Sequence, residues 1–215
     1  RIASMVEYIA HFGGAPQARF SVVTHSEPNT PASFTAGGKG YDLVQPAGAA
    51  AGRFLLYRSM QLFFQNGGGP CYVVSVGDYD SDVAAPALIA GIDALLQEQE
   101  PTLLVIPDAV LLSEAKCIAV QQAMLAHCGG RMRNRIAILD IWGGARDRRH
   151  AQSGPNDPIA RFRNALGTQH LDFAAAYYPW LNTTVVQDHD LGPANIVNTD
   201  ALADLGNTDA PLFNT

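Results

Sequence analysis

Three glycines and a proline, Gly67-Gly68-Gly69-Pro70, separate an apolar helical segment from an apolar segment of strand-forming residues. The order of these parts decides what the glycines can do. Phosphate-binding loops follow a strand and precede a helix, so that free N–H groups at the helix N-terminus face the anion. Here the glycines follow the helix, where glycine ends a helix in the left-handed conformation. The feature therefore indicates an architectural connection and argues against a nucleotide enzyme.

Helical and strand-like segments alternate between residues 46 and 181. We expect helices at 47–65, 86–99, 113–127 and 158–166, and strands at 71–76, 102–106, 135–141 and 173–178. The strands are apolar at almost every position, which is typical of strands covered on both faces. The pattern predicts an α/β fold with a doubly wound, mostly parallel sheet and helices on both of its faces.

The segments that flank this core differ from it in character. Ser4 and Glu7 predict a capping box for a short helix, residues 20–24 a strand, and residues 25–46 loops with a short strand at 41–44. Residues after 181 are mostly polar, with one strand expected at 183–187. We therefore expect an N-terminal appendage of helix, strand and loops (1–45), an α/β core (46–181) and a polar linker or start of an insertion (182–215). We also expect the chain to be a fragment of a longer protein.

Charge is sparse and unevenly distributed along the chain. Charged residues make up 16% of it, below the typical quarter, which favours either a large core or a surface hidden in an assembly. The net charge of −6 argues against nucleic acid as the main partner. Residues 131–163 hold eight of the 14 Lys and Arg residues, whereas 164–215 hold none. These stretches are either solvated loops or complementary patches between copies, with a candidate subunit-interface patch at Arg146, Arg148 and Arg149.

Chemistry is expected where strands end, because ligands bind beyond the carboxyl ends of open α/β sheets. Asp78, Asp108 and Asp140 stand at or near such ends. In an enzyme, Asp108 and Asp140 would hold a divalent metal or act as acid and base. As structural residues, Asp108 would cap the turn after Pro107 and Asp140 would pair with an arginine. The structural roles are favoured, since no histidine or second acid stands in a fixed motif around either aspartate.

The remaining chemical motifs are weak. The three cysteines, Cys71, Cys117 and Cys128, lack metal-ligand spacing and indicate buried, reduced thiols. His127 is expected at a helix C-terminus that Gly129 and Gly130 close, and residues 37–40 (Gly-Gly-Lys-Gly) are expected to be a flexible loop. We predict no catalytic residue, no cofactor and no metal. No apolar run has transmembrane length, so no membrane insertion is expected.

Four segments of the chain resemble those of a known family. They are residues 55–74, which contain the Asn-Gly-Gly-Gly-Pro-Cys-Tyr join, residues 101–108, residues 135–140 and residues 176–181 (Ala-Tyr-Tyr-Pro-Trp-Leu). In this order and spacing they resemble the tail sheath proteins of contractile phages and of phage-derived contractile injection systems. The opening helix, which ends in Phe-Gly, is similar as well, so the resemblance covers residues 2–181.

The resemblance implies a structural protein. Sheath subunits of this family stack as hexameric rings around an inner tube, assemble in an extended state and contract to drive the tube through a target envelope. The implied partners are other sheath subunits, the inner tube protein, and the baseplate and terminator components. The implied location is the bacterial cytoplasm during assembly, and then a phage tail or a phage tail-like injection particle.

The family core has a subtilisin-like fold without protease activity, and this chain carries no ordered Asp, His and Ser motif of that protease type. Compared with the family, the chain begins after the first terminal arm and stops before the C-terminal domain, so we expect it to be monomeric or weakly associated by itself. The alternative to a sheath subunit is a hydrolase or a small-molecule-binding domain that uses the strand ends near Asp108 and Asp140.

Overall fold

The structure of the protein is a computed structural model that describes residues 1–145 and 157–198. These residues form two compact units. The first combines Arg1–Ala15 with Phe54–Val185 and is a mixed α/β domain, and the second combines Pro16–Arg53 with the described residues from Val186 onward. The sequence-based division at 45/46 and 181/182 follows composition rather than contacts, and it stays a prediction. In the described part of the chain, no helix is both long and apolar enough to cross a membrane.

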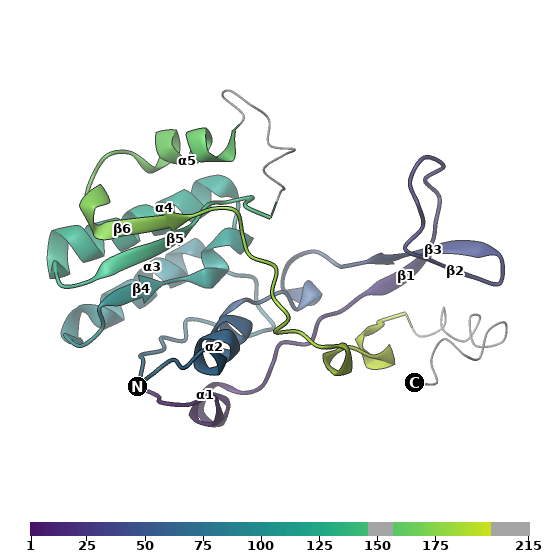
Figure 1. Cartoon of the computed structure of the whole chain (residues 1–215), viewed down its shortest axis with the longest axis horizontal. Coiled ribbons are helices and arrows are strands. Elements are labelled where there is room, and N and C mark those ends of the chain that lie inside the picture. Colours follow the sequence, from purple (N-terminus) through teal and green to yellow (C-terminus); the bar gives the residue numbers. More distant parts are fainter. Residues whose placement is uncertain (146–156, 199–215) are drawn as a thin grey trace. The chain divides into compact units, whose positions relative to one another are not determined.

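The α/β unit is built around a parallel three-stranded sheet (Figure 1). In chain order its helices and strands are α1 (Met5–Phe12), α2 (Leu56–Gln65), α3 (Ala85–Asp93), β4 (Leu103–Val105), α4 (Glu114–Leu125), β5 (Ile136–Asp140), α5 (Pro158–Leu166) and β6 (Ala174–Tyr177). The strand order is β4-β5-β6, with Leu104 opposite Ala137 and Ile138 opposite Ala175. The expected α/β class is therefore confirmed.

α5 shows how local signals fix a helix in this unit. Asp157 is the N-cap and accepts the Ala160 N–H at 3.0 Å, while Pro158 occupies the first helical position. Gly167 follows the last turn with a φ of 84°. The sequence predicts both ends of this helix, because each signal lies within three residues of the end that it marks.

The glycine run after α2 is a helix stop, as the sequence predicts. The Gly67 N–H donates to the Phe64 carbonyl at 3.2 Å and the Gly68 N–H donates to the Phe63 carbonyl at 2.9 Å. These two bonds, with a φ of +83° at Gly67, form a Schellman motif. The interpretation of the glycines as an architectural element is confirmed.

The strand expected directly after these glycines, at residues 71–76, does not form. Cys71 makes an isolated antiparallel bridge with Ile2, and the residues that follow it belong to no sheet in the described structure. Val74 and Val76 lie against Gly91 of α3, where an added Cβ would be 2.5 Å from a Val76 methyl group. The apolar run therefore packs along a helix instead of pairing as a strand, and it stays half-buried up to Val74 and exposed at Val76.

The helix expected at 47–65 is shorter in the structure. A 3₁₀ turn covers Gly48–Ala51, the chain changes direction at Gly52, and α2 starts only at Leu56. Gly52 has a φ of +63°, and a Cβ at this position would lie 1.9 Å from the Gln17 carbonyl oxygen. A close backbone approach inside the second unit thus ends the helical path, and the boundary between the units falls within the segment that was expected to be one helix.

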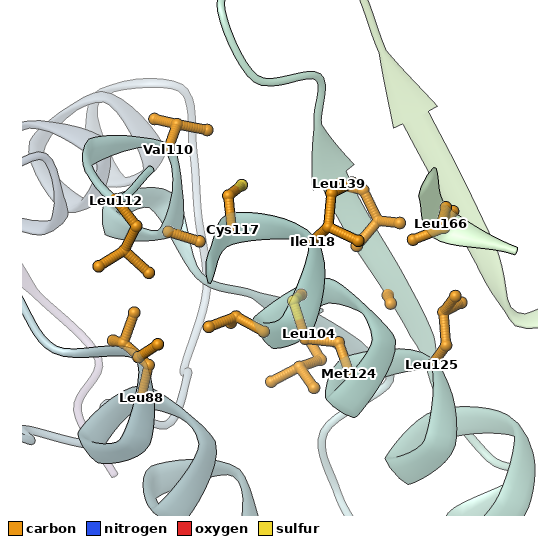
Figure 2. Packing of buried hydrophobic residues seen from close by; sticks show 14 of the residues in the cluster. Leu88, Leu104, Val110, Leu112, Cys117, Ile118, Met124, Leu125, Leu139 and Leu166 are labelled. Atoms are coloured by element: carbon orange, nitrogen blue, oxygen red, sulfur yellow. The ribbon is translucent and has the colours of Figure 1, made fainter. Parts of the chain in front are cut away.

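Helices cover one face of the parallel sheet. Leu104, Ala137 and Leu139 are at most 6% exposed and belong to one core with Val120 and Met124 of α4. Figure 1 shows α3 and α4 behind the sheet, and in Figure 2 Leu104 and Leu139 point toward the side chains of α4. α4 packs against α3, α5 and β5 and is the central helix of this layer.

The second helical layer that the sequence predicts is not present in the described residues. The strand positions on the other face are exposed, with Leu103 at 58%, Val105 at 49% and Ile136 at 42%. Leu103 lies opposite Ile136 in the register, so these side chains are neighbours on one surface. The prediction of helices on both faces is not met here, because an apolar run shows that both faces are apolar but not what covers each of them.

The sequence predicts that Gly129 and Gly130 end the helix, but the helical path continues through both of them. A π-helical turn, Ala126–Met132, continues α4 through both glycines, and Arg133 ends it with a φ of 57°. A Cβ on Gly129 would lie 2.6 Å from the Cβ of His170, so this glycine makes room for a side chain and does not stop the helix. His127, expected at a helix C-terminus, lies within this turn and is 3% exposed.

The second unit contains an antiparallel sheet in the order β1-β3-β2. Its strands are β1 (Ser21–Thr24), β2 (Phe34–Ala36) and β3 (Lys39–Val44). β1 and most of β3 were expected, whereas β2 was not. Gly37 and Gly38 connect β2 and β3 with φ values of 55° and 75°, which is the geometry of a type I′ hairpin turn. The expected flexible loop is therefore a tight turn.

The core of this unit is small. Val22 and Ala36 are buried in it, and Phe34, Tyr41 and Ile196 pack against them. Ile196 comes from the end of the described chain, which contains 3₁₀ turns at Asp188–Asp190 and Pro193–Asn195. The strand expected at 183–187 does not form in the structure.

Candidate functional site

Asp108 lies after β4 in a 3₁₀ turn, Pro107–Leu111, at the carboxyl end of the sheet. Its Oδ1 accepts the Leu55 N–H at 2.6 Å, and the Leu56 N–H also bonds to the carboxylate. These N–H groups open α2, so Asp108 caps that helix from a distant part of the chain. The expected capping role is right in kind, but the capped element is α2 and not the turn after Pro107.

Tyrosine side chains lie near Asp108, whose charge acts on Tyr8 and Tyr79. Tyr8 is 3% exposed and packs edge-on against Tyr57, with ring centroids 5.8 Å apart, and the Tyr79 hydroxyl donates to the Gly14 carbonyl at 3.1 Å. Burial raises the pKa of Asp108, and the two N–H groups of α2 lower it. Burial also raises the pKa of Tyr8, and the charges of Tyr79 and Asp108 raise it further. Asp108 is therefore part of the packing that joins α1 and α2.

Asp140 ends β5 and lies opposite Tyr177 of β6. Its carbonyl accepts the Gln121 Nε2–H at 2.7 Å, and burial raises the pKa of its carboxyl. Two carboxylates that share a metal or a proton shift each other's pKa, yet neither Asp108 nor Asp140 contributes to the shift of the other. The structure does not bring together the pair that the enzyme hypothesis requires. The expected pairing of Asp140 with an arginine does not occur among the described residues.

Asp78, the third acid that was expected near a strand end, follows a strand that does not form and has a local role. Its Oδ1 accepts the N–H groups of Asp80 and Ser81, each at 3.1 Å. An aspartate that bonds the backbone two and three residues ahead stabilises a turn. In the part of the chain that the structure describes, no three His, Cys, Asp or Glu side chains gather as a metal site would require.

Two indole rings fill the carboxyl edge of the sheet. Trp142 Nε1 donates to the Leu112 carbonyl at 2.8 Å, and Trp180 Nε1 donates to the Ile141 carbonyl at 3.0 Å. A Cβ on Gly144 would lie 2.5 Å from the Trp180 ring, so this glycine lets the indole pack there. The Tyr-Tyr-Pro-Trp run thus has a packing role at the place where open α/β sheets bind ligands.

The second unit contains a polar cluster that the sequence reasoning missed. His25 Nδ1 lies 2.8 Å from Asp42 Oδ2, and Asp42 Oδ1 accepts the Ser33 N–H at 3.1 Å and the Ser33 hydroxyl at 3.4 Å. In a serine hydrolase the hydroxyl bonds to the histidine and not to the carboxylate. The order of contacts is therefore wrong for activating Ser33 as a nucleophile.

This cluster fixes a loop. The hydrogen bond with Asp42 raises the pKa of His25, and bonds with the Glu27 and Thr30 backbone raise it further against the opposing effect of burial. The imidazole thereby ties residues 25–33 to the hairpin. No motif signals this arrangement, because His25 and Asp42 become neighbours only once β1 pairs with β3, where Val23 lies opposite Asp42.

Two of the cysteines are buried and reduced, as predicted. Cys117 and Cys128 are free and 0% exposed, whereas Cys71 is free and only partly buried. Burial raises the pKa of Cys117 to about 12 and that of Cys128 to about 11. Both thiols are protonated at neutral pH and are poor nucleophiles.

The uncovered face of the parallel sheet is the surface that most needs an explanation. It carries exposed large apolar side chains on three neighbouring strands, and we call these residues the open sheet face: Leu103, Val105, Ile136 and Tyr177. Parallel sheets are normally covered on both faces, and contiguous apolar patches mark sites of association. The open sheet face is therefore a candidate interaction surface.

Arg146, Arg148 and Arg149 lie outside the described residues, so the subunit-interface patch stays a prediction. Compared with known proteins, the chain matches no protein-family model and no curated protein.

Proposed function

We propose that this chain is the core of a structural subunit of a contractile tail sheath, which polymerises around an inner tube and contracts to drive it through a target cell envelope. The open sheet face supports this most strongly. Tyr177 is 59% exposed and Leu103 58%, in a chain with only 16% charged residues. Burial of apolar surface between copies is the main favourable term in association, and a subunit that assembles needs such a surface.

The carboxyl edge of the sheet supports a role without catalysis. Asp108 is engaged in capping α2, and the Trp142 and Trp180 indoles occupy the edge where a substrate would bind. The residue types that an enzyme would use are thus engaged in folding. We propose a non-catalytic, subtilisin-like core whose uncovered sheet face is closed by neighbouring subunits.

In this proposal the partners are other sheath subunits in helically stacked hexameric rings, the inner tube protein, and the baseplate and terminator components. The subunit assembles in the bacterial cytoplasm and becomes part of a phage tail or of a phage tail-like injection particle. No nucleotide is involved, because the free energy of contraction is stored in the packing of subunits.

Electron microscopy of the complete natural gene product, expressed with its neighbouring genes, tests the proposal. We expect tubular polymers. The double variant Val105→Lys, Ile136→Lys should fold, since both side chains are exposed (49% and 42%), but it should not polymerise, because two ammonium groups cannot be buried unpaired. Val6→Lys is the matched control, as Val6 is 77% exposed on α1.

The possible results separate the parts of the proposal. An unmodified protein that forms no polymer with its neighbours would remove the sheath function. Normal polymers from the Val105→Lys, Ile136→Lys variant would remove the open sheet face as an interface. Charge reversal of Arg146, Arg148 and Arg149 examines the predicted basic patch separately, and normal polymers from that triple variant would eliminate it.

A further inference from the structure

A buried arginine at the start of β5 is held by neutral acceptors. Arg135 is 2% exposed. Its guanidinium donates to the Asn134 side chain at 3.0 Å, to the Leu95 carbonyl at 3.3 Å and to the Glu98 carbonyl. It also lies 3.3 Å from His127 Nε2. Buried charges are normally paired with an opposite charge, so this guanidinium depends on each of its neutral acceptors.

The contact with Arg135 sets the state of His127. A guanidinium can only donate, so Nε2 must accept and the imidazole must be neutral. His127 lies in the π-helical turn Ala126–Met132, and its Nδ1 is buried without a hydrogen-bond partner in the described structure. π-helical turns are uncommon and often stand at functional positions. The turn therefore combines an unusual backbone with a titratable side chain that must stay uncharged.

The charges around His127 also favour the neutral ring. Burial lowers its pKa most, Arg135 and Arg131 lower it further, and Asp93 at the end of α3 opposes them. Asp93 is paired on the surface with Arg131 at 2.9 Å, so its charge is shared. A protonated His127 would lose its acceptor nitrogen and place a second cation 3.3 Å from the guanidinium.

We propose that the contact between His127 and Arg135 makes the π-helical turn Ala126–Met132 sensitive to acid. When His127 is protonated, this turn unfolds locally while α4 stays packed. This inference does not depend on the proposed function. Opening is expected in this turn because Gly129 and Gly130 give its backbone the greatest freedom. The turn also carries Cys128, which is 0% exposed when the turn is closed. Opening should therefore expose one specific thiol.

Cys117 provides an internal reference for this thiol. It is also 0% exposed but lies about three helical turns earlier, in the middle of the packed layer. Both thiols titrate far above the working pH, with pKa values of about 12 and about 11. While both thiols are buried, their thiolate fractions therefore change with pH by the same factor, and the ratio of labelling rates at Cys128 and Cys117 stays constant. Opening of the turn raises this ratio, because it exposes Cys128 and removes the burial that raises its pKa.

The experiment is pulsed labelling with a small maleimide between pH 4.5 and 7.5, read by mass spectrometry of the two cysteine peptides. We expect the ratio of the labelling rate of Cys128 to that of Cys117 to rise on acidification. The rise should be up to about tenfold per pH unit, in the pH range between the ordinary histidine pKa near 6.5 and the lower pKa of His127 in the closed turn. The His127→Gln variant keeps an uncharged acceptor, so its ratio should not change with pH. His11→Gln, in an exposed position on α1, should behave like the unmodified protein.

Three results would overturn the proposal. The first is a ratio that does not change with pH in the unmodified protein. The second is a rise of the same size in His127→Gln, which would assign it to another group. The third is an equal rise in labelling of Cys128 and Cys117, which would indicate unfolding of the whole unit rather than opening of one turn. A His127→Gln variant that does not fold is replaced by NMR titration of His127 in the unmodified protein, where a pKa at or above 6.5 also refutes the proposal.

Discussion

Replacement of Asp108 by alanine tests whether this residue is structural, as its geometry indicates. The carboxylate accepts the N–H groups of Leu55 and Leu56, and alanine leaves both groups without this acceptor. Loss of each bond costs about 1 kcal/mol, and loss of a helix N-cap by itself costs about 0.5–2 kcal/mol. We therefore expect Asp108→Ala to lower the free energy of unfolding of the α/β unit by about 2 kcal/mol.

Asp108→Asn is the matched control, because its amide oxygen can accept the same N–H groups without a charge. We expect a loss of less than about 1 kcal/mol. The two variants also separate the effect of pH. Burial raises the pKa of Asp108, so the folded state holds this proton more tightly, and its contribution to stability is lost as pH rises from the unfolded value near 3.9 through the folded pKa. The asparagine variant should lack this part of the pH dependence.

Tryptophan fluorescence during thermal unfolding is a suitable assay, since both tryptophans of the chain, Trp142 and Trp180, lie in the α/β unit. A loss of about 2 kcal/mol corresponds to a decrease in Tm of about 4–8 °C for a domain of 150–250 residues. An unchanged Tm in Asp108→Ala, or an equal decrease in both variants, would refute the role of Asp108 as the cap of α2.

Three further predictions follow from single positions. Gly67→Val should lower the free energy of unfolding, measured by chemical denaturation, by about 1 kcal/mol or more, because Gly67 has a φ of +83°. Gly69→Ala should be nearly neutral, because the space around its Cβ position is open. Equal effects of the two variants would contradict the assigned helix stop. Gly144→Ala should cost about 1–3 kcal/mol and shift tryptophan emission to the red, since its Cβ would lie 2.5 Å from the Trp180 ring; an unchanged spectrum would argue against that packing. The raised pKa of His25 means that its contribution to stability is complete below pH 6.5 and is lost as pH rises through the folded pKa. Hydrogen exchange of residues 26–33, corrected for intrinsic rates, should therefore accelerate with pH in the unmodified protein but not in His25→Gln, and parallel profiles would contradict this.

Local signals made several elements predictable from the sequence. α5 has its cap, its proline and its closing glycine within the helix and its immediate neighbours, and the Schellman stop at Gly67 is formed by residues of α2 and the next two positions. The hairpin turn at Gly37 and Gly38 also has a local signal, since two glycines between strand-forming residues favour a type I′ turn. The sequence reasoning missed β2, which precedes this turn, because it interpreted the glycines as a flexible loop.

The candidate site was less predictable, since its partners lie far apart in the chain. The sequence marks Asp108 as an acid at a strand end, but the helix that it caps begins about fifty residues earlier, and only folding brings the two together. His127 gave the appearance of a helix terminus, and its burial beside Arg135 depends on how β5 follows the π-helical turn.

The sequence by itself determined the α/β class, the order of the helices and strands from α2 onward with the exception of residues 71–76 and 183–187, and the role of the glycine run as a helix stop. Each of these is encoded in residues within a few positions of one another. The tertiary structure decided the rest. It ended the path toward α2 at Gly52 through a backbone contact with Gln17, and it packed Val74 and Val76 on α3 instead of in a sheet. It also left one face of β4, β5 and β6 uncovered. An apolar residue in the sequence indicates that its side chain favours burial away from water. Only the arrangement of the folded chain determines the surface against which it is buried.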